Sequence, residues 1–348
     1  MIRFGVIGGG YGRQVYLPAL WSLPGAVVAA VADGGSGRMA TTDLDYFPSW
    51  RTLVEHATID AVSIATPPAL HAQIVETALS RGLHVLCEKP FGRDRAEAEA
   101  MARAAAVPAG IATAIGFQFR YEPGLQALRQ VLAEGRIGRL RRIDVTWVTS
   151  GRADPGRPFG FQHDRAAGGG VIEGFLCHSL DYAFWLSGQE PRRAWARGDI
   201  VIGQRADAAG AARIVTAEDA ADAIVELADG VVLGARVTNC QPGRDLHRIA
   251  LAGDGGWAEL DQAARAGAQH LHVGTPANPR PAAIELPAPA PGADSRLPAF
   301  SRLAADLLAA IAGEPSADLP RFPDGVRVRR VLAALHRAMA EGGWQDCT

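Results

Sequence analysis

Short apolar runs alternate with amphipathic stretches over the first third of the chain. Each apolar run has the length of a strand, and the stretches between them repeat their apolar side chains every three or four residues, as one face of a helix does. This alternation predicts a parallel sheet wrapped by helices. The expected strands are 2–7, 26–32, 60–66, 83–87 and 110–117, and the expected helices are 13–23, 69–81 and 95–106.

The pattern changes after residue 120. Short segments with alternating apolar and polar positions now recur, and turn dipeptides such as Asp229-Gly230 separate them, which predicts antiparallel strands. The stretch 275–298 is rich in Pro and Ala and therefore excludes a central strand. The expected strands are 142–148, 195–202, 222–227, 231–239, 247–252 and 257–260, and the expected helices are 123–133, 172–186, 300–312 and 324–341.

The length of 348 residues agrees with two domains of roughly 150 residues each. We expect an α/β protein with a first domain at 1–120 and a second at 121–348, whose C-terminal helices pack back on the first. The 35 basic and 37 acidic side chains leave a net charge of −2, which argues against nucleic acid as the main partner.

Three further absences narrow the class of protein. No apolar run reaches the roughly 18 to 20 residues of a membrane helix, so we expect no membrane partner. Met1 leads directly into an apparent strand rather than a signal segment, so we expect a cytoplasmic protein. The four cysteines are far apart and form no CxxC pair, so we expect neither a disulfide framework nor a metal site.

A glycine-rich turn follows the first expected strand. Gly8 and Gly10 fit the first two positions of a dinucleotide-binding turn, which allow the tight bend and the approach of a pyrophosphate. The third glycine position falls on Arg13, and Gly12, after Tyr11, stands one residue early. Strand, glycine turn and helix nevertheless come in the order that a dinucleotide site requires.

Asp33 ends the next expected strand, 23 residues after Gly10. A carboxylate at this position accepts hydrogen bonds from ribose hydroxyls and repels a 2′-phosphate, which favours NAD over NADP. NADP stays open as the alternative, because Ser36 and Arg38 could hold that phosphate. Asp33 could instead cap the backbone of its own turn.

The segment Thr66-Pro67-Pro68 lies at the carboxyl end of the strand 60–66, and His71 follows it. Open parallel sheets bind ligands at this rim, so Thr66, Pro67 and His71 are candidate cofactor residues. The two prolines could equally serve to start the following helix, and the two interpretations are compatible.

The segment Glu88-Lys89-Pro90 follows the strand 83–87, and Lys89 is the single lysine among 35 basic residues. Lysine is a compact ammonium whose pKa falls when it is desolvated, whereas arginine stays charged at any working pH. The rim location puts Lys89 beside the expected nicotinamide. A retained surface lysine is the alternative interpretation from composition alone.

A second glycine run, 168–170, precedes a helix that carries Glu173, His178 and Asp181. His178 and Asp181 are one helical turn apart, so they can share a face. Histidine, with an ordinary pKa near 6.5, is a natural acid and base near neutrality. A core histidine is the alternative.

These segments resemble the glucose-fructose oxidoreductase and inositol dehydrogenase family (Gfo/Idh/MocA) over almost the whole chain. The resemblance implies a doubly wound Rossmann domain, followed by an α/β domain with a large, mainly antiparallel sheet that binds substrate and often mediates oligomers. Within it, Lys89 matches the lysine that contacts substrate oxygen and cofactor, Pro90 a proline often preceded by a cis peptide, and His178 the proton-transfer residue. The matching segments are GVIGGGYG (5–12), IDAVSIATPPALH (59–71), GLHVLCEKP (82–90), GFQFRYEPG (116–124), GGGVIEGFLCHSLDYAFWLSG (168–188) and RFPDGVRVRRVLAALHRA (321–338).

One departure from the family pattern affects the expected acid beside His178. The family commonly has Asp four residues before the histidine, where this chain has Gly174, and Glu173 stands one residue earlier. On an α-helix this shift turns the side chain by about 100°. Three alternatives are open. Local backbone geometry could place Glu173 next to His178, or Asp181 or the substrate could orient His178. The enzyme could also work without an acid at this position.

The resemblance implies hydride transfer between NAD(P) and a secondary hydroxyl or ketone of a sugar, cyclitol, aminosugar or sugar derivative. His178 would move the proton and Lys89 would hold the substrate oxygen. The candidate cofactor residues are Gly8, Gly10, Tyr11, Gly12, Arg13, Asp33, Thr66, Pro67, His71, Glu88, Lys89 and Gln118. The candidate substrate residues are Arg120, Trp147, Arg152, Arg157, Phe159 and His163.

Two other functions remain open at this point. One is reduction of a keto-sugar nucleotide, with the same site run in reverse. The other is a sensor or regulator that binds NAD(P) without turnover. An Arg-bearing loop suits a phosphate or sugar nucleotide, whereas aromatic side chains suit a bare sugar face. The resemblance also implies a homo-oligomer, a dimer or a tetramer.

Overall fold

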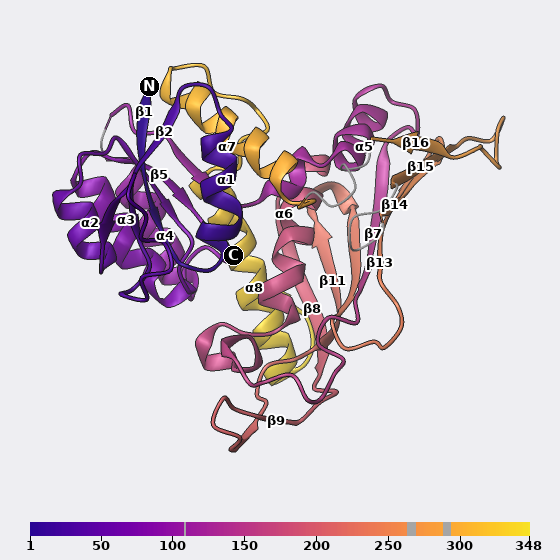
Figure 1. Ribbon diagram of the computed structural model, residues 1–348. Helices are drawn as coiled ribbons and strands as arrows, with labels where there is room; N and C mark the ends of the chain where they lie inside the picture. Colours follow the sequence, from indigo (N-terminus) through magenta and orange to yellow (C-terminus); the bar gives the residue numbers. More distant parts are fainter. Residues whose placement is uncertain (108, 263–268, 288–293) are drawn as a thin grey trace. The chain divides into compact units, whose positions relative to one another are not determined.

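The structure is a computed structural model, and it describes residues 1–107, 109–262, 269–287 and 294–348. The chain divides into two compact units. The first unit comprises residues 1–121 and 295–329, and the second comprises residues 122–294 and 330–348. Each unit is built around one large sheet (Figure 1).

The first unit contains a six-stranded parallel sheet with the strand order β3-β2-β1-β4-β5-β6. The order reverses between β1 and β4, and open parallel sheets bind ligands in the crevice outside the carboxyl ends of the strands at this point. The residues that follow β1, β2, β4 and β5 share that edge. The strands are β1 (Ile2–Ile7), β2 (Ala26–Ala32), β3 (Asp45–Phe47), β4 (Ala61–Ile64), β5 (His84–Cys87) and β6 (Thr113–Ile115).

Helices cover both faces of this sheet, because its central strand β1 is apolar on both sides. Phe4 and Val6 belong to a buried cluster with Leu20 and Phe300, which lie on α1 and α7. Gly5 points the other way and lies against Leu53 of α2. A helix from residues 297–311 thus completes the core of the first unit. The helices are α1 (Leu17–Trp21), α2 (Trp50–His56), α3 (His71–Ser80), α4 (Arg95–Ala105) and α7 (Leu297–Ile311).

The second unit contains a nine-stranded sheet with the order β16-β15-β14-β13-β7-β12-β11-β8-β17. The neighbours β7 and β12 are parallel, and every other neighbouring pair in the described sheet is antiparallel. The strands are β7 (Leu140–Val148), β8 (Pro191–Asp199), β11 (Ala220–Leu227), β12 (Val232–Thr238), β13 (Leu246–Gly253), β14 (Trp257–Gln262), β15 (Gln269–Gly274), β16 (Ile284–Leu286) and β17 (Gln345–Asp346). A separate hairpin consists of β9 (Gln204–Ala206) and β10 (Ala212–Ile214).

One face of the nine-stranded sheet is buried, as the alternating pattern of its strands predicts. In β7, Ile143, Val145 and Trp147 are buried, whereas Asp144 and Thr146 on the opposite face are partly exposed. The helices α5 and α6 pack against strands of this sheet (Figure 1). The bounds are α5 (Pro123–Ala133), α6 (Cys177–Ser187) and α8 (Phe322–Glu341), and the unit division falls within α8.

The predicted α/β fold class, with a parallel sheet first and a mainly antiparallel sheet second, is confirmed. Seven elements were not predicted, and most of them are three residues or shorter or lie at sheet edges: β3, α2, β9, β10, β15, β16 and β17. Two expected helices also begin differently, because π-helical turns, η1 (Gly12–Tyr16) and η6 (Ile172–Leu176), precede α1 and α6.

Candidate active site

The glycine turn after β1 requires glycine at its first position and packs closely against the sheet at Gly12. Gly8 has a φ of 128°, and a Cβ at this position would lie 2.3 Å from the backbone oxygen of Ala65. Gly12 opens the π-helical turn η1, and its Cβ would lie 3.4 Å from Val6. Gly12 therefore provides the close helix–strand packing that the sequence motif assigns to residue 13, while Arg13 is exposed.

This turn leaves open space where a dinucleotide needs it. A Cβ built on Gly10 would meet no atom within 4 Å among the described residues. A Cβ on Gly9 would lie 3.0 Å from the Cβ of Asp33, so the glycine turn and the end of β2 are adjacent. At the same edge, the buried Oγ1 of Thr66 has no hydrogen-bond partner among the described residues. Open backbone and an unsatisfied polar atom fit a bound NAD(P).

The Asp33 carboxylate holds its own loop together. Its Oδ1 accepts from the hydroxyl of Tyr46 (2.8 Å) and the N–H of Gly37 (3.3 Å), and its Oδ2 accepts from the N–H of Met39 (3.0 Å). Burial raises the pKa of Asp33, but these hydrogen bonds outweigh it and bring the pKa to about 2. The capping role that the sequence left open is therefore present, and a ribose would share or replace these donors.

The side chain of His71 contacts two segments at this edge of the sheet. One ring nitrogen lies 3.1 Å from the carbonyl oxygen of Pro90 and the other lies 2.9 Å from that of Thr66. The side chain is completely buried, and this burial lowers the pKa of His71 to about 4. The neutral ring has one N–H and donates to one of these two oxygens, and its contacts connect the segment after β4 to the segment after β5. Its predicted contact with the cofactor stays a prediction.

Glu88 and Lys89 lie at the carboxyl end of β5. The Glu88 carboxylate is buried and accepts from the Tyr16 hydroxyl (2.9 Å) and from the backbone N–H of Lys89 (3.1 Å). Burial raises the pKa of Glu88, and the charge of Lys89 opposes that rise. Lys89 is half-buried, and the peptide bond between Lys89 and Pro90 is cis. The glycine turn, Asp33, Thr66 and Lys89 thus share one sheet edge.

Two further residues join this part of the first unit. The amide of Gln118 donates to the hydroxyl of Tyr11 (3.4 Å), and the guanidinium of Arg296 lies 5.2 Å over the Tyr11 ring. The buried Oε1 of Gln118 has no hydrogen-bond partner among the described residues. Arg296 was not predicted to lie here, because it is 285 positions along the chain from Tyr11 (296 − 11).

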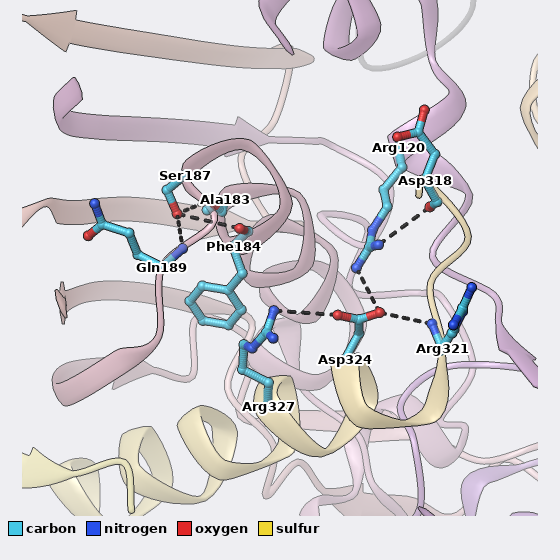
Figure 2. A network of polar contacts seen from close by, with 9 residues as sticks. All are labelled: Arg120, Ala183, Phe184, Ser187, Gln189, Asp318, Arg321, Asp324 and Arg327. Carbon is cyan, nitrogen blue, oxygen red and sulfur yellow. Dashed lines mark hydrogen bonds and ion pairs between the residues drawn. The ribbon is translucent and has the colours of Figure 1, made fainter. Parts of the chain in front are cut away.

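Arg120 is buried inside the first unit (Figure 2). Its guanidinium donates to the carbonyl oxygen of Asp318 (3.4 Å) and lies 3.5 Å from the carboxylate of Asp324. Asp324 also accepts from the backbone N–H of Arg321 (2.9 Å) and lies 3.4 Å from the guanidinium of Arg327. Arg120 therefore ties the segment after β6 to the start of α8, and its predicted substrate contact stays a prediction.

In the second unit, His178 lies on α6 beside an aromatic group. The ring centroid of Trp147, on β7, is 6.3 Å from that of His178 and 4.8 Å from that of Phe175. Trp147 also stacks on His247, with centroids 4.3 Å apart. The predicted residues Trp147 and His178 are therefore together within this unit.

His247 and Tyr182 complete this group and were missed by the sequence analysis. The hydroxyl of Tyr182 lies 3.1 Å from Nε2 of His247 and donates to Ser179. Complete burial lowers the pKa of His247 to about 3, so its ring is neutral at physiological pH. One signal was available, because Tyr182 follows His178 by four residues and thus shares its helix face. At the C-terminal end of α6, the Ser187 hydroxyl donates to the Ala183 carbonyl (Figure 2).

The π-helical turn η6 changes the position of Glu173. In this turn the N–H of Cys177 bonds to the carbonyl of Ile172, five residues back. Glu173 therefore stands one turn before His178, as a residue four positions back would in an α-helix, so the 100° shift of an α-helix does not apply to this turn. Its carboxylate lies 2.9 Å from Nε2 of His336, while Asp181 is buried on α6.

The remaining substrate candidates follow β7. Arg157 is exposed and donates to the carbonyl of Gly151 (2.8 Å). The Phe159 ring lies 5.7 Å from that of His163, and Arg152 lies in the same loop. Among the described residues, no group of three or more His, Cys, Asp or Glu side chains could hold a metal ion. Within the same part of the chain, no helix is long and apolar enough to cross a membrane.

Two family models match this chain. One, described as "Oxidoreductase family, NAD-binding Rossmann fold", matches residues 2–112, and the other, "GFO/IDH/MocA C-terminal domain", matches residues 125–259. The chain belongs to the Gfo/Idh/MocA family of oxidoreductases. The resemblance predicted from the sequence is confirmed, and the matching N-terminal model describes an NAD-binding domain.

Individual family members are similar over nearly the whole chain. An uncharacterized oxidoreductase of Synechocystis sp. is 28% identical, covering 97% of this chain and 94% of that protein. Levoglucosan dehydrogenase of Pseudarthrobacter phenanthrenivorans is 27% identical, covering 99% and 98%. The solved structure of a levoglucosan dehydrogenase with NADH and L-sorbose shares the fold, with a TM-score of 0.88 and 23% identity over 100% of this chain and 99% of that one.

Proposed function

We propose that this protein is an NAD-dependent dehydrogenase that oxidises a secondary hydroxyl of a sugar, cyclitol, aminosugar or sugar derivative, or reduces the corresponding ketone. The observation that carries the proposal is the position of Lys89. The single lysine of the chain stands at the carboxyl end of β5, on the edge that also bears the glycine turn and Asp33. Dinucleotides bind at such an edge, so its ammonium is placed for the reacting end of the cofactor.

The choice of NAD over NADP rests on Asp33. Its pKa of about 2 keeps the carboxylate charged at all working pH values. A fixed negative charge at the end of β2 repels a 2′-phosphate. Fluorescence titration with NADH and NADPH tests this preference, and tighter binding of NADPH would transfer the ribose contact to Ser36 and Arg38.

The proposed mechanism assigns separate tasks to Lys89 and His178. A bound nicotinamide supplies the hydride acceptor or donor. The Nζ of Lys89 donates a hydrogen bond to the substrate oxygen and stabilises the negative charge that develops there. The imidazole of His178 takes the hydroxyl proton during oxidation and returns it during reduction. Buried Glu88 holds the backbone N–H of Lys89 in place.

Turnover tests this assignment. A panel of inositols, aldoses, aminosugars and sugar nucleotides is offered with the tighter-binding cofactor, and absorbance at 340 nm is followed. We expect Lys89→Arg to be severely impaired although it keeps the charge, because the guanidinium differs in shape. We expect His178→Ala to lose roughly 100-fold or more in kcat, as for removal of a general acid and base.

The controls separate this proposal from its rivals. His56→Ala, at an exposed position, should keep full activity. Turnover of Lys89→Arg within a few-fold of the parent would contradict the role of Lys89. Cofactor binding without turnover on the whole panel would favour a regulator, and turnover of the sugar nucleotides alone would favour the reductase.

We also propose that the protein forms a homo-oligomer through the outer face of the nine-stranded sheet. The partly exposed Asp144 and Thr146 of β7 lie on that face. Light scattering of the purified protein tests this part, and a monomer at micromolar concentration would contradict it.

A further inference from the structure

A buried polar cluster follows the two parallel strands of the second unit. Because β7 and β12 are parallel, their carboxyl ends meet at one edge of the sheet. The chain segments beyond them are joined there, since the N–H of Thr149 donates to the carbonyl of Thr238 and the N–H of Arg152 donates to that of Asn239 (both 2.8 Å). We call Arg152, His163 and Asn239 the Arg152 cluster.

Asn239 is 1% exposed, yet its side-chain amide has no partner among the residues that the structure describes. Neither its Oδ1 nor its Nδ2 makes a hydrogen bond to any described residue. Its backbone is fixed on both sides, by the bond to Arg152 and by its own N–H, which donates to the carbonyl of Asp219 (3.1 Å). A buried amide with no partner costs free energy, and such groups call for a missing partner such as a ligand or water.

His163 is a second buried donor without an acceptor. Its Nδ1 accepts from the N–H of Gly160 (3.0 Å), so the proton of the neutral ring is on Nε2. That Nε2 has no partner among the described residues, and the residue is 3% exposed. Burial, with the charges of Arg205, Arg152 and Arg157 acting in the same direction, lowers the pKa of His163 to about 4, so the ring stays a neutral donor.

Arg152 differs from the two arginines beside it. Arg205 donates to the carbonyl oxygens of Arg152 (2.6 Å) and Asp154 (2.7 Å), and Arg157 donates to that of Gly151. These two side chains hold the loop in shape. The guanidinium of Arg152 makes no hydrogen bond or ion pair with a described residue, and burial, reinforced by Arg157, lowers its pKa to about 10.

The cluster therefore has hydrogen-bond donors and a positive charge, but few acceptors and little negative charge to pair with them. Asp219 is the carboxylate that acts on both Arg152 and His163, and its own oxygens accept from the N–H groups of Val201 (2.7 Å) and Ile202 (3.1 Å). A guanidinium, an imidazole N–H and an amide NH2 suit an oxyanion, because charge-assisted hydrogen bonds to such a group are the strong ones.

We propose that the Arg152 cluster binds an oxyanion of the substrate, a carboxylate or a phosphate, so that the protein acts on an acidic sugar derivative. This inference rests on the proposed function, because it takes the substrate to bind near His178. The strand β7 links the two places, since it carries Trp147, which lies beside His178, and ends at Val148, four residues before Arg152. The acidic group lies at the end of β7 while the reacting carbon lies nearer His178.

The experiment compares acidic and neutral sugars with the parent and with Arg152→Gln. Initial rates with NAD are measured for aldoses, for the matching uronates and for the matching 6-phosphates. We expect kcat/KM to favour one acidic class in the parent, and Arg152→Gln to lower the acidic-to-neutral ratio by roughly 10- to 100-fold, mainly through KM, as the loss of a hydrogen bond to a charged group predicts. Arg136→Gln, at an exposed position, is the matched control.

A binding measurement separates this inference from the proposed function. Calorimetric titration with the uronate, the sugar phosphate and inorganic phosphate, in the presence of NADH, needs no turnover. Asn239→Ser and His163→Gln provide second variants should Arg152→Gln fail to fold. Binding of an acid that these variants weaken supports the cluster even if no sugar is oxidised. Oxidation of neutral sugars with no preference for acids, or no binding of any of the three anions, overturns it.

Discussion

In each unit a π-helical turn follows the glycine run, but the two turns have different roles. In η1 of the first unit, the N–H of Leu17 donates to the carbonyl oxygen of Gly12. In η6 of the second unit, the N–H of Cys177 donates to the carbonyl oxygen of Ile172. Both are i to i+5 bonds, so each turn holds one residue more than an α-helix. Such turns are rare and concentrate at functional sites.

The additional residue serves packing in one unit and a polar contact in the other. In η1 it brings Gly12 against β1, so that the turn buries Val15 and Tyr16 and the tyrosine reaches Glu88. In η6 it places Glu173 one turn before His178, in contact with His336. Gly12 and Glu173 each stand one residue away from the position that a motif assigns. Whether such a residue can still fill the motif's role depends on the backbone conformation between the motif residues.

The largest expected effect compares the strained glycines of the two turns. A Cβ on Gly8 would lie 2.3 Å from the Ala65 backbone oxygen, and one on Gly170 (φ 109°) would lie 2.1 Å from the Glu218 carboxylate. We expect Gly8→Ala and Gly170→Ala each to lower the free energy of unfolding by at least about 2 kcal/mol, because strain and overlap add. Urea unfolding measures both.

Gly10→Ala is the matched control for Gly8→Ala. Its Cβ meets no described atom within 4 Å, so the variant should unfold like the parent while losing NADH affinity. Parent-like stability of Gly8→Ala would break the comparison, since the first turn would then tolerate a side chain at both positions.

Acid should destabilise both units through buried histidines, among them His71 in the first unit and His247, in addition to His163, in the second. The pKa is about 4 for His71 and about 3 for His247, both below the ordinary value of 6.5 because of burial. Between pH 6.5 and 4 the unfolded chain binds protons that the folded chain does not, so the free energy of unfolding falls as pH falls, by up to about 3 kcal/mol for His71.

The measurement is the slope of the free energy of unfolding between pH 7 and pH 5. His71→Gln and His247→Gln should each flatten that slope, whatever they cost at pH 7, whereas His56→Gln, at an exposed position, should leave it unchanged. An equally steep slope in all three variants would mean that neither buried ring governs acid stability.

The smallest expected effect concerns Gly174, in the middle of η6. A Cβ there would meet no described atom within 4 Å, and the backbone is helical. We expect Gly174→Ala to raise the free energy of unfolding by about 0.5 to 1 kcal/mol, because glycine costs that much in a helix interior. Thermal unfolding checks this, and destabilisation would show that the π-helical turn requires glycine.

The first sheet and the edge that carries the glycine turn, Asp33 and Lys89 could be predicted from the sequence because their signals are local. Apolar runs, the glycine turn and the acid at Asp33 each lie within a few residues of the backbone they shape. The strand β3 and the helix α2 were missed because they are too short for their period to be recognised.

The missed site residues have a different cause. His336 meets Glu173 across 163 positions of sequence, and Tyr182 meets His247 across 65, so no local pattern could pair them. The π-helical turns were missed because an i to i+5 bond leaves no periodic trace over five residues. Asn239 carried no signal, because its buried, unpartnered amide becomes visible only with the surrounding loop in place.

The place of α7 in the first core has a consequence for how the chain is made. Phe300 and Leu303 fill the same buried cluster as Phe4, although about 170 residues lie between the two segments of that unit (295 − 121 = 174). At a synthesis rate of roughly 5 to 20 residues per second, the N-terminal segment waits about 10 to 35 seconds for its missing helix. During that time the nascent chain exposes an apolar sheet face, and residues 122–294 of the second unit are synthesised before the first unit can be finished.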